Sequence, residues 1–97
     1  MASENVTRTV TYPTTGRGTI NTGTTLNVAF GVIRIASSAL VRNFDTTNDI
    51  YFTLNGGTDR TIVDAGKTIE INGEKIQSII LGNVSGSAVE YQVVLYG

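Results

Sequence analysis

The chain has 97 residues, which suffices for one domain with its own hydrophobic core. It contains neither cysteine nor histidine, which excludes disulfides, thiolate nucleophiles, imidazole bases and the common zinc sites. Seven basic and eight acidic residues give a net charge of −1, and no like-charge run favours binding to nucleic acid or to an anionic membrane. We therefore expect a protein that is not an enzyme and needs no cofactor.

The N-terminal segment is expected to begin with a strand at residues 6–12, where apolar or basic side chains alternate with threonines. Pro13 ends this strand, and residues 14–25 contain almost no apolar side chains. A polar segment of this length predicts a Thr/Gly-rich loop. The chain then divides into an N-terminal arm with its loop at 1–25 and a β-domain at 26–97. The alternation alone leaves open whether the arm folds back onto its own domain or reaches a neighbouring subunit.

After residue 25 the sequence consists of short apolar runs separated by turn residues. Gly31 lies where the apolar alternation changes phase, which predicts a β-bulge. Asn72-Gly73 lies between two apolar runs and predicts a tight type I′ hairpin, because both central residues of that turn need a positive φ. Besides the first strand, the expected strands lie at 26–30, 32–35, 39–44, 50–54, 61–63, 68–71, 76–81 and 88–96.

The regular spacing of these runs predicts the fold class. Turn residues recur every 8–12 positions or so, and no helix of normal length fits between the strands. We expect an all-β protein, a single β-sandwich of about eight short antiparallel strands of jelly-roll type.

Two polar motifs resemble binding sites for phosphate or metal ions. Gly66-Lys67-Thr68 matches the end of a phosphate-binding P-loop, but Thr61 stands where the first glycine is required and a strand follows instead of a helix. A β-turn is the simpler prediction. Asp45, Asn48 and Asp49, or Asp59 with Asp64, could offer oxygens to calcium, yet neither group supplies the six to eight ligands that calcium requires. We therefore predict no metal site.

Carboxylates and tyrosines are the candidate residues for hydrolysing or binding a carbohydrate. Glu70 and Glu90 could form a glycosidase pair, but each lies within a predicted strand, where the outward face of a sheet explains it. Exposed tyrosines can stack on sugar rings. Tyr91 shares its strand face with apolar residues and is expected in the core, whereas Tyr96 lies on the opposite face. The tyrosines considered for sugar binding are Tyr12, Tyr51, Tyr91 and Tyr96.

Four segments of the C-terminal half, at 43–45, 49–57, 64–71 and 85–97, give the chain a family resemblance. In turn spacing and in the closing tyrosine-containing strand, residues 40–97 resemble small β-sandwich virion proteins of tailed bacteriophages. These include capsid decoration or cement proteins and small tail or fibre components. The resemblance implies a structural subunit that binds a protein lattice, is made in the host cytoplasm and ends in the virion. Residues 1–25 match no part of that pattern.

The expected partners follow from this resemblance and from the strand edges. They are the major capsid protein or another virion protein, together with further copies of this chain, with a trimer favoured, because the edges of a small sheet need pairing or protection. The alternative is a carbohydrate- or receptor-binding module of a tail, fibre or lectin-like protein. If the arm pairs with a neighbour by β-augmentation, the interface is formed by Val6, Arg8, Val10, Tyr12 and Arg17.

Overall fold

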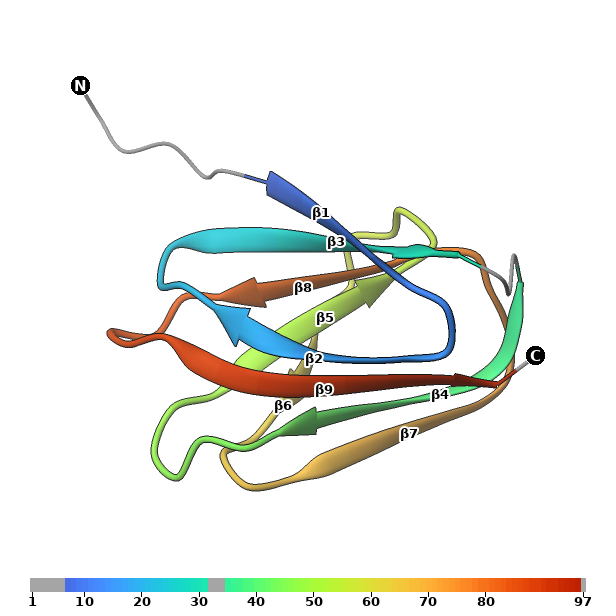
Figure 1. Ribbon diagram of the computed structural model, residues 1–97. Coiled ribbons are helices and arrows are strands. Elements are labelled where there is room, and N and C mark those ends of the chain that lie inside the picture. Colours follow the sequence, from blue (N-terminus) through green and yellow to red (C-terminus); the bar gives the residue numbers. More distant parts are fainter. Residues whose placement is uncertain (1–6, 32–34, 97) are drawn as a thin grey trace.

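The computed structural model describes residues 7–31 and 35–96 (Figure 1). Over these residues the chain forms nine strands in two sheets and no helix, so the all-β prediction is confirmed. The strands are β1 (Thr7–Tyr12), β2 (Thr15–Ile20), β3 (Thr24–Phe30), β4 (Ala36–Asn43), β5 (Ile50–Leu54), β6 (Thr61–Val63), β7 (Thr68–Ile76), β8 (Ile79–Asn83) and β9 (Val89–Tyr96).

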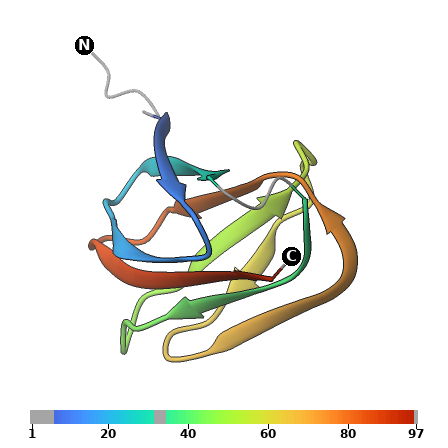
Figure 2. The same cartoon turned by 45° about the vertical axis from the view of Figure 1, so that its right-hand side comes forward.

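The five-stranded sheet has the order β1-β3-β8-β5-β6, and the four-stranded sheet has the order β2-β9-β4-β7. Figure 2 shows β9 (red) lying between β2 (light blue) and β4 (green). All neighbouring strands are antiparallel except β1 and β3, which run parallel. The expectation of purely antiparallel strands is wrong at this pair. The chain crosses to the other sheet and back between them, so that β3 resumes the direction of β1.

The eight strands after β1 pair in a nested order. β2 pairs with β9, β3 with β8, β4 with β7, and β5 with β6. The first four strands of this series therefore pair with the last four in reverse order, as in one long antiparallel ribbon folded at the β5–β6 connection. Consecutive strands from β2 to β5 alternate between the two sheets. The ribbon thus winds around a single core.

The core contains side chains from both sheets. Strand β9 shows the underlying alternation most clearly, because Val89, Tyr91, Val93 and Leu95 are buried while the residues between them are not. This period of two follows from the opposite directions of successive side chains in a strand. The burial of Tyr91 in the core confirms the prediction for that residue.

Residues 15–20 form strand β2, so the prediction of a loop over 14–25 is wrong. The two glycines of this strand face inward. A Cβ atom at Gly16 would lie 2.1 Å from the ring of Tyr12, and one at Gly18 would lie 2.9 Å from the hydroxyl of Tyr91. The tyrosine rings fill the space that apolar side chains of β2 would otherwise occupy. Because Ile20 also belongs to the core, residues 7–25 are part of the same domain and do not form a separate arm.

The type I′ turn occurs at Asn55-Gly56 instead of the predicted Asn72-Gly73. Asn55 and Gly56 have φ values of 55° and 72°, and the N–H of Gly57 donates to the carbonyl of Leu54 over 2.8 Å. The segment at 72–73 instead continues within β7, so the predicted hairpin is wrong.

The burial of two isoleucines explains why β7 continues through residues 72–73. Ile71 and Ile76 are both buried although an odd number of positions separates them, which a regular strand cannot achieve. The register with β4 shifts between the pairs Ser38↔Asn72 and Ala36↔Ile76, and this irregularity turns both isoleucines inward.

Other local predictions are confirmed or fall outside the described residues. The segment at 64–67 is a β-turn, with the N–H of Lys67 donating to the carbonyl of Asp64 over 3.0 Å and Gly66 at a φ of 75°. The strands predicted at 50–54 and 61–63 match β5 and β6. The strand predicted at 32–35 lies outside the described residues except for Ile35, which is in no strand.

Two buried asparagines fix the loops at one end of the sheets. The side-chain amide of Asn43 donates to the carbonyls of Asn48 and Val63, over 2.9 and 3.0 Å. The amide of Asn83 donates to the carbonyls of Ile20 and Ser87, over 2.9 and 2.8 Å. Each side-chain amide therefore donates to two backbone carbonyls, which offsets the cost of burying a polar group.

The packing of Tyr12 over Gly16 generates a stability prediction. Gly16→Val should destabilise the protein by about 1–3 kcal/mol, because the new side chain would overlap the tyrosine ring and force it out of place. Chemical denaturation monitored by circular dichroism measures the change. Gly86→Ala is the matched control, because a Cβ at Gly86 meets no atom within 4 Å, and its effect should stay within about 0.5 kcal/mol. Equal stabilities of Gly16→Val and the wild type would contradict the packing.

Candidate interaction surface

The outward side of the four-stranded sheet gathers arginine, tyrosine and aliphatic side chains on neighbouring strands. In the strand register Gln92 lies between Arg17 and Arg42, and Val94 lies beside Leu40. These residues alternate with buried ones along each strand, so they point away from the core. We call this surface the β9 face, and it consists of Arg17, Leu40, Arg42, Phe44, Glu90, Gln92, Val94 and Tyr96.

One end of the β9 face is organised around the ring of Phe44. The guanidinium carbon of Arg17 lies 4.3 Å from the ring centroid and that of Arg42 lies 5.6 Å from it. Arg17 also donates from Nε to a carboxylate oxygen of Glu90 over 2.6 Å, and Arg42 donates from Nε to the hydroxyl of Thr68 over 3.1 Å. An exposed ion pair adds little to stability. The ion pair positions Arg17 and the hydrogen bond to Thr68 positions Arg42, so both cationic groups are held on the surface.

The other end of the β9 face is apolar. Val94 and Leu40 are half-buried neighbours, and the side chain of Tyr96 is 46% exposed. Tyrosine and arginine are enriched in protein interfaces because they combine a large contact area with hydrogen-bonding groups. The β9 face therefore has the composition of a protein-binding surface.

The five residues predicted at an interface do not come together on one surface. Arg17 belongs to the β9 face, and Arg8 is exposed on β1. Val10 and Tyr12 instead pack against the core of their own chain, because β1 pairs with β3 and folds back over β2. Val6 lies outside the described residues.

Tyr12 and Tyr91 join β1 to β9 through their hydroxyl groups, which are 2.7 Å apart. Burial, together with the hydrogen bond to Tyr12, raises the pKa of Tyr91 above its ordinary value. Both causes favour the neutral phenol of Tyr91. The hydrogen bond between the two hydroxyls therefore links β1 to β9 within the fold.

The other residues considered for sugar chemistry are dispersed. Glu70 lies on β7 and Glu90 on β9, with β4 between these strands. The ring of Tyr51 is buried against Gly82 and is covered by Arg60, whose guanidinium carbon lies 4.2 Å from the ring centroid. Tyr96 is the most exposed of the four tyrosines, all of which belong to the described part of the chain.

Two of the candidate calcium ligands, Asp45 and Asp49, accept hydrogen bonds from the backbone of turns. The carboxylate of Asp45 accepts hydrogen bonds from the backbone N–H groups of Thr47 and Asn48, and these bonds lower its pKa. Asp49 accepts a hydrogen bond from the N–H of Ala65 over 2.9 Å. Over the described ranges, no three acidic, cysteine or histidine residues come together as a metal site.

Comparison with known proteins gives a match in fold. No protein-family model and no curated protein matches the chain. Among solved structures, the chain is similar to a de novo designed double-stranded β-helix determined by solution NMR. The TM-score is 0.58 at 19% sequence identity, over 84% of this chain and 96% of the designed one. At this identity the likeness concerns the fold alone.

Among the described residues, no helix is long and apolar enough to cross a bilayer.

The tyrosine pair generates a prediction that a double-mutant cycle can measure. Tyr12→Phe and Tyr91→Phe should each lower the free energy of unfolding by about 1 kcal/mol, because each leaves one hydroxyl without its partner. The double variant should lose less than the sum of the two single variants, since no unpaired hydroxyl remains. Additive losses in chemical denaturation would show that the two hydroxyls do not interact.

Proposed function

We propose that this chain is a structural protein of a virion, without enzymatic activity, that docks on other virion proteins through the β9 face. The observation that carries the proposal is the cluster of Arg17, Arg42 and Tyr96 around aliphatic residues on one exposed sheet. The resemblance of residues 40–97 to small β-sandwich virion proteins of tailed bacteriophages supports the same role. The proposed partner is the major capsid protein or another virion protein.

We further propose that the two sheets form a jelly-roll β-sandwich. The nested pairing of β2 to β5 with β6 to β9, and the alternation of consecutive strands between sheets, support this topology. The similarity to a designed double-stranded β-helix supports it too. A jelly-roll leaves the outer surface of each sheet free to bind a partner.

The charge pattern of the β9 face favours a protein partner. Arg17 is already paired with Glu90 at one end of the β9 face, and Glu70 lies next to Leu40 in the strand register, so charges of both signs border the apolar residues. A nucleic acid would instead call for a uniformly basic surface. Apolar residues bordered by polar and charged groups are usual in protein interfaces.

The proposal includes a homo-oligomer, with a trimer favoured. β1 and β6 end the five-stranded sheet, and β2 and β7 end the four-stranded sheet. Edge strands present backbone groups that another chain can pair with. Pairing of β1 with a neighbouring subunit would add a strand to that subunit's sheet and would let a few copies surround one attachment point.

A carbohydrate- or receptor-binding module is the second candidate, and the exposed Tyr96 beside Val94 favours it. A tyrosine ring on a flat sheet can stack on the apolar face of a sugar. Glycan-array binding that is lost in Tyr96→Ala would support this candidate over docking to a capsid.

The test of the proposed function is co-sedimentation with particles of the encoding virus that were prepared without this protein. The wild-type chain should sediment with the particles, and Arg42→Ala/Tyr96→Ala should bind at least about tenfold more weakly, because interface arginines and tyrosines each contribute roughly 1–2 kcal/mol or more. Ile62→Ala is the matched control, since Ile62 is a similarly exposed apolar residue on the other sheet. A double variant that binds as tightly as the wild type would contradict docking through the β9 face.

A further inference from the structure

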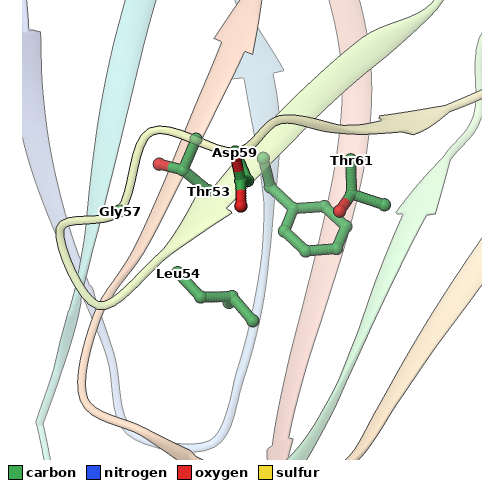
Figure 3. Close-up of a pocket in the computed structure, with 6 residues that line it drawn as sticks. Thr53, Leu54, Gly57, Asp59 and Thr61 are labelled. Carbon is green, nitrogen blue, oxygen red and sulfur yellow. The ribbon is translucent and has the colours of Figure 1, made fainter.

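A small cavity of about 250 Å³ opens at the end of β5, on the five-stranded sheet. It is lined by Phe52, Thr53, Leu54, Gly57, Asp59 and Thr61 (Figure 3). None of these residues belongs to the β9 face, so the cavity is separate from the proposed docking surface.

The cavity exists because β6 is shorter than β5. β6 pairs with the first three residues of β5, from Ile50 to Phe52, and Thr53 and Leu54 continue without a partner on that side. The turn at Asn55-Gly56 then reverses the chain. The segment that leads back to β6 consequently forms the opposite wall, with Asp59 and Thr61 facing the edge of β5.

The polar groups of the cavity have no partners elsewhere in the described part of the chain. Figure 3 shows the Asp59 carboxylate in the cavity, with Thr53 on one side and Thr61 on the other. The neighbouring Arg60 does not neutralise this carboxylate through an ion pair, because its guanidinium group lies over the ring of Tyr51, 4.2 Å from the ring centroid. One negative charge is therefore available to a ligand in the cavity.

The remaining wall is apolar and narrow. Leu54 and Phe52 form it, and the cavity is smaller than the roughly 300–1,000 Å³ that is usual for pockets that hold drug-sized ligands. A ligand of this size is a single side chain or a short alkyl compound. A ligand that matches both walls would have an apolar stem and a cationic, hydrogen-bond-donating end.

We propose that this cavity binds a primary alkyl ammonium group, supplied by a lysine side chain of a partner protein. An ammonium group carries a positive charge and donates hydrogen bonds, and the cavity offers it the carboxylate of Asp59, which has no ion-pair partner among the described residues. The methylene stem of the lysine would lie along Leu54, as such stems do on apolar surfaces.

The test uses the full chain, ¹⁵N-labelled, and Nα-acetyl-lysine methylamide as the probe. Titration should shift the amide signals of Gly57, Asp59 and Thr61 in a saturable manner, and added salt should weaken the binding because the pair is partly exposed to solvent. The norleucine analogue, which has a similar stem but no charge, should cause no such shifts. Absence of saturable shifts with the lysine probe would overturn the proposal.

Two variants that each remove one negative charge show whether binding of the lysine probe depends on the carboxylate of Asp59. Asp59→Asn should weaken binding of the lysine probe about fivefold, the change that corresponds to loss of a partly exposed charge pair. Asp64→Asn, in the turn before β7, should leave it unchanged. Equal affinities of Asp59→Asn and the wild type would overturn the proposal, as would equal shifts of these amides by methyl glucoside. Tighter saturation by 1,4-diaminobutane than by the lysine probe would overturn the assignment to a protein side chain in favour of a free polyamine.

Discussion

The pairing of β2 with β9 is the interaction on which the rest of the structure depends. It joins the beginning of the ribbon to its end and gives β9 a strand neighbour on each edge. One face of β9 packs in the core, and the opposite face forms the candidate surface. The pairing needs the tyrosine rings of β1 and β9 to pack on the inner side of β2. Gly16 and Gly18 provide that space, and the hydroxyls of Tyr12 and Tyr91 connect the two strands across it.

The fold could be predicted from the sequence wherever a strand carries its own apolar side chains. β5 and β6 were located correctly because Ile50, Phe52 and Val63 mark them, and β9 because its buried residues alternate without interruption. The sequence did not predict β2, because tyrosines from other strands fill most of its inner face. The residues of β2 therefore lack the apolar alternation by which a strand is recognised locally. The Asn72-Gly73 prediction failed for a related reason, since the requirement to bury both Ile71 and Ile76 prevailed over the local turn preference.

The candidate surface was predictable only in fragments. Sequence alternation placed Tyr96 and Val94 on the side opposite Tyr91, which the structure confirms. Arg17 was expected at an interface, but its position near Arg42 and Phe44 depends on the register of β2 and β4 with β9, over residues far apart in the sequence. The cavity beside Asp59 depends likewise on how far β6 extends along β5.

Native-state hydrogen exchange of the β2 amides tests the central claim most directly. If residues 15–20 form a strand of the core sheet, the β2 amides that hydrogen bond to β9 should open with free energies close to that of global unfolding measured by denaturant. If this segment is a loop on the surface of an otherwise complete domain, the same amides should exchange as readily as those of the exposed segment at residues 58–60. That second result would contradict the account.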